Sequence, residues 1–185
     1  PKPLLATERM AIDYVRAKDG EDLYRYYDRN RSHLAPWEPL RPEGYYSADA
    51  WRTRAKQQEA SCREGASYHF VVRGHHKAEI AAVCNLSNLV RGAILGCHLG
   101  YSLDHEIQGS GIMGEALSAI IPFVFDELEL HRIMANYMPK NQRSARLLER
   151  LGFEKEGLAR DYLCIAGQWE DHVLTSRVAG PAMEN

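Results

Sequence analysis

The segment Gln108-Gly109-Ser110-Gly111-Ile112-Met113-Gly114 is the most informative part of the chain, together with Leu99-Gly100-Tyr101 just before it. A strand-like run leads into a glycine-rich loop, and the loop becomes the first turn of an amphipathic helix. The first N–H groups of a helix have no partner within it, and with the helix dipole they attract negative charge. Because glycines let the backbone approach a phosphate closely, the segment predicts a phosphate-binding loop.

Two other kinds of phosphate loop do not fit these residues. The Walker pattern needs Lys and then Ser or Thr after its second glycine, where this chain has Ile112 and Met113. Gly109, Gly111 and Gly114 match the Rossmann pattern formally, but the loop follows four strand-like segments and lacks the required βαβ context. Glycines that only turn the chain remain the alternative to a phosphate site.

The rest of the chain alternates between strand and helix patterns. Strand patterns cover residues 10–15, 68–73, 80–86, 95–103, 131–137, 153–156, 162–165 and 168–176. Helix patterns cover 20–33, 47–63, a stretch that opens at the glycine loop, and 141–151. We expect Asp19 and Ser47 to cap the first two helices, residues 35–39 to be extended because of two prolines, and 88–92 to form a turn. This order predicts one domain over residues 1–185, an α/β fold in which helices flank a mixed sheet in three layers.

Composition and charge exclude several classes of protein. The net charge is −2, the composition is 45% hydrophobic and 26% charged, and this balance argues against a general nucleic-acid binder. The four cysteines form no C-x-x-C pair and have no metal-ligand spacing with histidine, so we expect reduced thiols and no metal. With no signal-peptide core at the start and no long apolar run, we expect a soluble, cytoplasmic protein with no membrane partner.

Two linked motifs resemble those of the GNAT acetyltransferases. Residues 108–111 resemble the pyrophosphate loop of that family, [RQ]-x-x-G-x-[GA], and 141–144 followed by 147–153 resemble its second signature. Met113 departs from the usual Gly or Ala, but Met followed by x-Glu-Ala is common in the Rim-type branch, the ribosomal-protein-alanine N-acetyltransferases. The resemblance implies the GNAT fold, a three-layer α/β/α sandwich with a mixed, mostly antiparallel sheet.

Further segments extend the likeness to the Rim-type branch over nearly the whole chain. They are His33-Leu34-x-Pro-Trp37, Val90-Arg91-Gly92, Leu99-Gly100-Tyr101, His131 to Pro139, and Gly167-Gln168-Trp169-x-Asp171-His172. The chain is most similar to the RimJ type, which acetylates the N-terminal alanine of a small-subunit ribosomal protein. The partner implied is therefore the N-terminus of a ribosomal protein, on the ribosome or its precursor; a homodimer is left open.

The resemblance implies acetyl-CoA as co-substrate, without a metal, and a direct attack of the amine on the thioester. The residues implied to bind the cofactor are Leu99, Gly100, Tyr101, Gln108, Gly109, Ser110, Gly111, Ile112, Met113, Asn141, Ser144 and Arg146. The pantetheine arm is expected to pair with the strand at Leu99 to Tyr101, where two strands splay apart and a bulge over 99–102 would serve. A backbone amide there is the expected oxyanion donor.

The catalytic and acceptor residues also follow from the resemblance. Asp161 is the first candidate for the base, with Glu156 and Glu115 as alternatives, and Ser144 is the candidate to steady or protonate the thiolate. For each of these, a solvated or helix-stabilising side chain is the alternative interpretation. Tyr137 and Tyr162 are further candidates for the acid. His33 and Trp37 are expected to line the acceptor groove.

Two other functions remain open from the sequence. A GNAT that acetylates a polyamine or aminoglycoside would gather carboxylates around its acceptor groove, whereas the acidic residues here look scattered. A ribosome-assembly factor that keeps the fold as a scaffold would draw support from Arg143, Arg146 and Arg150, which lie at helical spacing.

Overall fold

Eight strands form one sheet in the order β1-β2-β3-β4-β5-β6-β8-β7 in the computed structural model, which describes residues 2–180. The strands are β1 (Leu5–Ala6), β2 (Met10–Tyr14), β3 (Tyr68–Gly74), β4 (Ile80–Val90), β5 (Gly96–Leu103), β6 (Arg132–Tyr137), β7 (Glu154–Ile165) and β8 (Gln168–Val178). The helices are α1 (Gly20–Arg29), α2 (Arg31–Leu34), α3 (Ala48–Arg63), α4 (Ile112–Asp126) and α5 (Gln142–Arg150), with 3-10 turns η1 (Ala17–Asp19), η2 (Ala35–Trp37) and η3 (His105–Ile107).

The sheet is mixed and mostly antiparallel, as predicted. Among the described strands, β5 and β6 alone pair in parallel, and the chain crosses from one to the other through α4. The other neighbouring strands pair antiparallel, including the long β7–β8 hairpin at one edge.

Helices cover both faces of the sheet and confirm the three layers. On one face α4 packs against strand residues such as Phe70 and Leu86, with Leu117 fully buried between them. On the other face α1 and α3 pack over Val71 and Val83.

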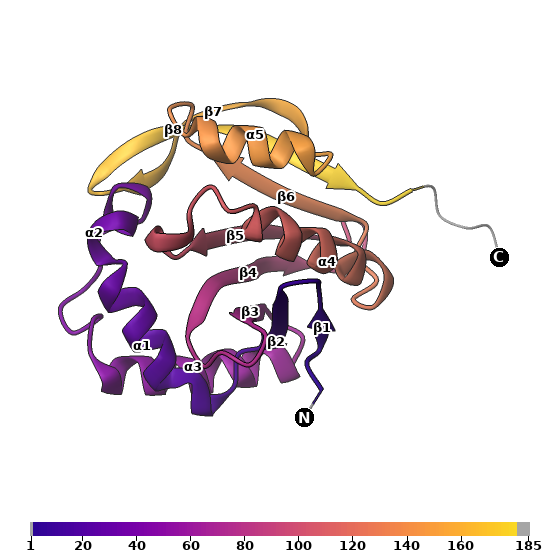
Figure 1. Cartoon of the computed structure of the whole chain (residues 1–185). Coiled ribbons are helices and arrows are strands. Elements are labelled where there is room, and N and C mark those ends of the chain that lie inside the picture. Colours follow the sequence, from indigo (N-terminus) through magenta and orange to yellow (C-terminus); the bar gives the residue numbers. More distant parts are fainter. Residues whose placement is uncertain (1, 181–185) are drawn as a thin grey trace.

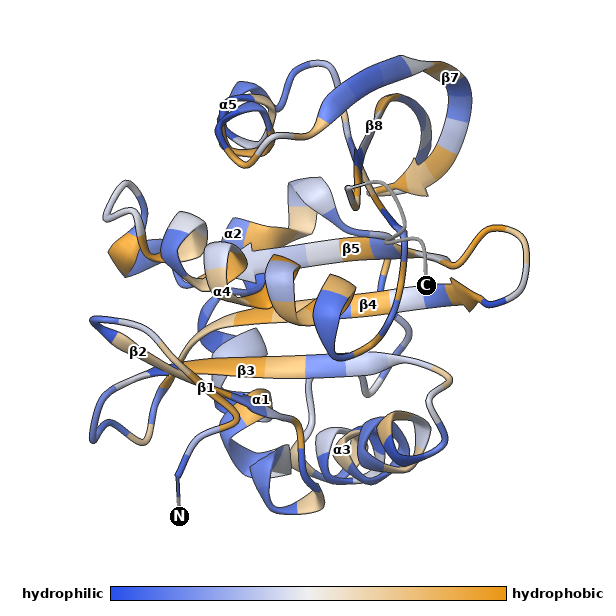
Figure 2. Cartoon of the chain, turned by 90° about the vertical axis from the view of Figure 1, so that its right-hand side faces the viewer, coloured by the Kyte–Doolittle hydropathy of each residue, from blue (hydrophilic) through white to orange (hydrophobic). Residues whose placement is uncertain are grey.

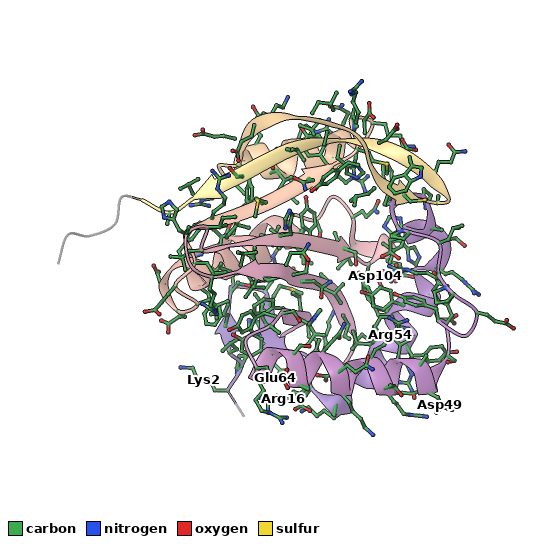
Figure 3. The ribbon with its side chains drawn as sticks, turned by 180° about the vertical axis from the view of Figure 1, so that it is seen from behind. Lys2, Arg16, Asp49, Arg54, Glu64 and Asp104 are labelled. Atoms are coloured by element: carbon green, nitrogen blue, oxygen red, sulfur yellow. The ribbon has the colours of Figure 1, made fainter. Side chains whose placement is uncertain are left out.

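The figures show the same layers. Figure 1 shows α4 on the viewer's side of the sheet. Figure 3, from behind, shows the opposite layer, where Asp49 and Arg54 of α3 and its C-cap Glu64 are labelled. In Figure 2 apolar residues run along β3 and β4 in the middle of the sheet. Each fully buried Leu, Ile or Phe side chain in these layers contributes roughly 1.5–3 kcal/mol.

Of the two predicted N-terminal helix caps, the structure confirms Ser47 and contradicts Asp19. The Ser47 side chain accepts a hydrogen bond from the Ala50 N–H at 3.2 Å, and Gly65 has a φ of +69° just after α3. Asp19 does not cap α1 with its side chain. Its carboxylate accepts a hydrogen bond from the Arg16 N–H at 2.8 Å and pairs with Arg73 at 3.1 Å, so it ties the turn before α1 to β3.

Residues 20–37 differ from the predicted helix and extended segment. The single helix expected over 20–33 is broken at Asn30, whose fully buried side chain bonds to Asp104 and His105 instead of leaving the helix regular. Residues 35–37 form a 3-10 turn and not an extended segment. Pro36 is compatible with this turn because proline is tolerated in the first positions of a helix, where its missing N–H has no partner to lose.

Two strand predictions were also wrong in their limits. β4 continues to Val90, through the turn expected over 88–92, and its ladder with β5 shifts register between Ser87 and Val90. The two strands predicted over 153–156 and 162–165 are parts of one strand, β7, which begins at Glu154 and pairs with β8 through two register shifts. Nearly all of β7 is exposed on both faces, so it lacks the alternation from which a strand is recognised.

Candidate active site

The parallel pairing of β5 and β6 stops halfway along both strands. Three residues of β5, from Gly96 to His98, pair with Arg132 to Met134 of β6. β5 then continues to Leu103 and β6 to Tyr137 without further pairing between them. The two facing edges therefore have backbone groups available to an extended ligand, as expected for the splayed strands.

The bulge expected over residues 99–102 is not the cause of this splay. The β4–β5 ladder runs without interruption from Leu99 opposite Leu86 to Leu103 opposite Ala82. The register shift of this pair of strands lies on β4 between Ser87 and Val90, opposite the part of β5 that does pair with β6.

The glycine loop lies between the end of β5 and the start of α4. Gly109 and Gly111 have φ values of +74° and +79°, a region that residues with a side chain rarely adopt. Within residues 2–180, the N–H groups of Gly109, Gly111, Met113 and Gly114 have no hydrogen-bond acceptor. Free donors of this kind at the N-terminus of a 15-residue helix attract negatively charged groups such as phosphate.

The start of α5 faces the unpaired part of β5. Asn141 caps α5, since its side chain accepts a hydrogen bond from the Ser144 N–H at 3.1 Å. The Ser144 hydroxyl is hydrogen-bonded to the Tyr101 hydroxyl, so α5 and β5 are joined across the splay. Burial raises the pKa of Tyr101 to about 12, although the bond to Ser144 opposes this shift. The phenol therefore stays protonated at neutral pH.

The arginines of α5 lie on its outer side. Arg143, Arg146 and Arg150 are exposed, whereas Leu147 and Leu148 are buried on the opposite side of the helix. None of the three arginines forms an ion pair with a described carboxylate. They are cations available to a ligand with phosphate groups.

His33 of α2 connects the expected acceptor side to the glycine loop. The Gln108 side-chain nitrogen lies 2.6 Å from Nε2 of His33. Burial lowers the pKa of His33, and the neighbouring His105 and the positive charge of Arg143 lower it further. α2, the loop and α5 therefore meet around this neutral imidazole.

A buried polar network holds α2 in this place. Asp104, at the end of β5, accepts hydrogen bonds from Arg29 at 2.5 Å and Asn30 at 3.2 Å, and Asn30 in turn accepts one from the His105 N–H. Figure 3 labels Asp104 where β5 approaches the first helices. Burial raises the pKa of Asp104, but the bonds from the Glu106 N–H, Arg29 and Asn30 outweigh it, so the pKa is lowered overall. Nothing in the sequence pattern marked this network.

Trp37 lies in η2, next to the β7–β8 turn. Its side chain is 39% exposed, so it is not an ordinary core residue. The Ala166 N–H in the turn donates a hydrogen bond to the Glu38 carbonyl at 2.9 Å, and Leu40 lies against Gly167. The tip of the β7–β8 hairpin thus contacts the segment that carries Trp37.

The carboxylates proposed as the base occupy different places. Asp161 is exposed, has a φ of +45°, and its N–H donates a hydrogen bond to the Asp171 side chain at 2.9 Å. Asp171 lies two residues before Val173, the partner of Tyr137 at the end of β6, so Asp161 lies toward the open end of the splay. Tyr162, next to it, is 37% exposed with its ring 5.7 Å from that of His172.

The alternatives to Asp161 are engaged elsewhere. Glu156 pairs with Arg132 at 2.5 Å, and Arg132 lies opposite Gly96 at the closed end of the β5–β6 pairing. Hydrogen bonds from Ser176 and then Arg132 lower the pKa of Glu156.

Glu115 accepts hydrogen bonds from Thr7 and from Arg9, which lower its pKa. It is therefore an ionised carboxylate that anchors these two residues and not a free base. Tyr137 is buried.

Two further observations concern metal ions and membrane-spanning helices. Within residues 2–180, no group of three or more His, Cys, Asp or Glu side chains is placed to hold a metal ion. In the same part of the chain, no helix has the length and apolarity needed to cross a membrane.

A sheet that splays beside a glycine-rich helix start is the arrangement expected of an acetyl-CoA-dependent transferase of the GNAT family, and the comparisons show that family. The family model for the acetyltransferase (GNAT) domain matches residues 9–154, and the chain belongs to this family. It is 46% identical, over 95% of its length and 91% of the relative's, to the [ribosomal protein uS5]-alanine N-acetyltransferase of Escherichia coli.

Solved structures agree with this assignment. The structure of the ribosomal-protein-S5-alanine acetyltransferase from Vibrio fischeri superposes with a TM-score of 0.92 at 38% identity, covering 97% of this chain and 98% of that one. Mycobacterium smegmatis RimJ, solved in complex with CoA-disulfide, superposes with a TM-score of 0.86 at 29% identity, covering 92% and 82% of the two chains. The predicted family and its Rim-type branch are confirmed.

Proposed function

We propose that this chain, acting as a single domain in the cytoplasm, transfers the acetyl group of acetyl-CoA to the N-terminal α-amine of a ribosomal protein, with alanine as the favoured first residue. The observation that carries the proposal is the 46% identity to the Escherichia coli uS5-alanine enzyme, which extends over nearly the whole of both chains. The substrate is encountered on the ribosome or its precursor.

The cofactor lies along the splay in this proposal. The free N–H groups of the glycine loop bind the pyrophosphate, and Arg146 of α5 is available to the nucleotide phosphates. The pantetheine arm pairs with the unpaired edge of β5 at Leu99 to Tyr101. This places the thioester beside the start of α5, where Asn141 positions Ser144.

The reaction is a direct attack in a ternary complex. The amine nitrogen bonds to the thioester carbonyl carbon, the carbon–sulfur bond breaks, the amine loses a proton and the thiolate gains one. A backbone N–H of β5 stabilises the oxyanion, and Ser144 donates a hydrogen bond to the departing sulfur. The positive end of the α5 dipole favours the thiolate at the same place.

The acceptor amine needs little help to lose its proton. An α-amine with a pKa of about 7.7 is roughly one third neutral at pH 7.4, whereas only about one lysine in a thousand is. A carboxylate such as Asp161, acting directly or through one water, is a sufficient base for the α-amine. Its exposure and its place toward the open end of the splay suit that role.

The acceptor wall suits a small, uncharged first residue. Trp37 presents a partly exposed aromatic surface, and His33 is held neutral beside it on the same stretch of chain. Two of the acidic groups nearby are already paired, Glu38 with Arg41 and Glu170 with Lys140. These ion pairs leave fewer free carboxylates to hold a polyamine.

The proposal is tested by the release of free thiol from acetyl-CoA in the presence of different acceptors. The panel holds short peptides that begin with Ala, Ser or Met, and spermidine. Thiol release with the Ala peptide, and little with spermidine, is the expected result. Turnover with spermidine alone would replace the proposal with a small-amine acetyltransferase. Binding of acetyl-CoA without any turnover would favour a scaffold role in ribosome assembly.

A further inference from the structure

The carboxylate of Glu115, in the first turn of α4, forms hydrogen bonds with Thr7 and Arg9, which lie between β1 and β2. Glu115 accepts hydrogen bonds from the Thr7 hydroxyl at 2.6 Å, from the Arg9 backbone N–H at 2.8 Å and from Nε of Arg9 at 2.6 Å. The Thr7 bond is the main reason that the pKa of Glu115 is lowered. The carboxylate is ionised, and it fixes the orientation of the Arg9 guanidinium.

The other end of the guanidinium lies against the glycine loop. Nη1 of Arg9 donates a hydrogen bond to the Ser110 carbonyl at 3.0 Å. A Cβ atom on Gly111 would lie 3.6 Å from Nη2 of Arg9. Arg9 therefore contacts the Ser110–Gly111 peptide, in the middle of the segment that binds the pyrophosphate.

This contact determines where the Gly111 N–H points. In a planar trans peptide, the carbonyl of one residue and the N–H of the next point in opposite directions. Because the Ser110 carbonyl is held toward Arg9, the Gly111 N–H is directed away from it. That N–H is one of the free donors of the loop among the described residues. Glycine can adopt several backbone conformations, so without this contact the Ser110–Gly111 peptide would have more freedom to rotate.

We propose that Arg9 is a positioning residue for acetyl-CoA: anchored by Glu115, it holds the Ser110–Gly111 peptide so that the loop presents its N–H groups to the pyrophosphate. The Arg9 side chain is 47% exposed, and its positive charge adds to that of the N-terminal end of the α4 dipole. The inference rests on the binding of acetyl-CoA at this loop, and it is independent of which amine is acetylated. No sequence motif outside the loop indicated that the N-terminus takes part.

The test compares two ligands that differ in the phosphates. The affinities of acetyl-CoA and of S-acetylpantetheine, which lacks the nucleotide and pyrophosphate, are measured without acceptor for the wild type, Arg9→Ala, Arg9→Lys and Glu115→Gln. Arg52→Ala is the matched control, because Arg52 forms surface ion pairs on α3 with Glu21 and Asp49. Thermal unfolding of each variant shows whether it is folded.

In Arg9→Ala we expect the affinity for acetyl-CoA to fall about tenfold, the usual effect of losing a hydrogen bond in a charged site, and that for S-acetylpantetheine to stay unchanged. Glu115→Gln should act in the same direction. Arg9→Lys should recover only part of the loss, since lysine lacks the rigid, planar fork of donors with which Arg9 bonds Glu115 through Nε and the Ser110 carbonyl through Nη1. An equal fall for both ligands, no change for either, or full recovery by lysine would each overturn the proposal. Because no acceptor is used, a wrong acceptor assignment would leave this result intact.

Discussion

The Ser144 hydroxyl is predicted to support the departing thiolate, and Ser144→Ala measures that contribution. The hydroxyl lies at the start of α5, bonded to Tyr101 across the unpaired strands. As the carbon–sulfur bond breaks, negative charge develops on the sulfur. A hydrogen bond to a charged group contributes roughly 1.5–3 kcal/mol. Since 1.36 kcal/mol corresponds to tenfold in rate, the rate of acetyl transfer should fall about 10- to 150-fold.

Tyr101→Phe should lower the rate of acetyl transfer less than Ser144→Ala does, because Tyr101 is a poor proton donor. Burial raises the pKa of Tyr101 to about 12, whereas a thiol titrates at about 8.5, so a proton transfer from Tyr101 to the thiolate is uphill by about 5 kcal/mol. Tyr101 can therefore orient Ser144 but is a poor proton donor. The loss of one ordinary hydrogen bond, about 0.5–1.5 kcal/mol, corresponds to a rate lower by about 2- to 12-fold.

The assay is a single-turnover measurement of thiol release at saturating acetyl-CoA, so that slow product release does not mask the chemical step. Ser87→Ala, on the exposed part of β4, is the control for replacing a serine. The affinity for acetyl-CoA should change little in both variants. A Ser144→Ala rate within twofold of the wild type would refute the role of this hydroxyl. An equal loss in Tyr101→Phe and Ser144→Ala would refute the order assigned to the pair.

Three further predictions concern the loop, the acceptor wall and the network beneath them. Gly109→Ala should weaken acetyl-CoA binding and lower the free energy of unfolding by about 1–2 kcal/mol, because alanine is strained at a φ of +74° although no atom blocks its Cβ. Gly157→Ala is the control, since Gly157 has equal space and no positive φ, and calorimetry should show no loss of stability. Trp37→Ala should raise KM for an Ala peptide several-fold and leave KM for acetyl-CoA unchanged, whereas equal rises in both would contradict its place on the acceptor wall. Asp104 has a lowered pKa in the folded protein, so its contribution to stability is present above about pH 4 and is lost as the pH falls further. Urea unfolding should accordingly show Asp104→Asn to be less stable than the wild type at pH 7, with a difference that shrinks toward pH 3; a constant difference would disprove the linkage.

The parts of the site that depend on local sequence could be predicted. The glycine loop and the helix that follows β6 are read from residues that lie next to one another, and the conformations of Gly109 and Gly111 follow from their residue type. The family motifs are local for the same reason. The loop and the helices next to it therefore appeared in the sequence close to their positions in the structure, where α4 begins at Ile112 and α5 covers Gln142–Arg150.

The parts that depend on distant contacts could not be predicted. Asn30 breaks a helix whose apolar spacing is regular, because its side chain bonds to Asp104 and His105, some 75 residues away. In the sequence Glu115 is a candidate base, whereas in the structure its carboxylate is bonded to Thr7 and Arg9, which are distant in the chain. β7 is held by pairing with β8 and has no buried face of its own, so its pattern predicted two short strands.

The central claim, acetylation of an N-terminal α-amine, is tested most directly by where the acetyl group is placed on one peptide. The peptide begins with alanine and contains an internal lysine, and after incubation with acetyl-CoA at pH 7.4 the product is sequenced by tandem mass spectrometry. The account predicts the acetyl group on the alanine nitrogen, with the lysine unmodified, because the α-amine is several hundred times more often neutral at this pH. Acetylation of the lysine with a free N-terminus would contradict the account.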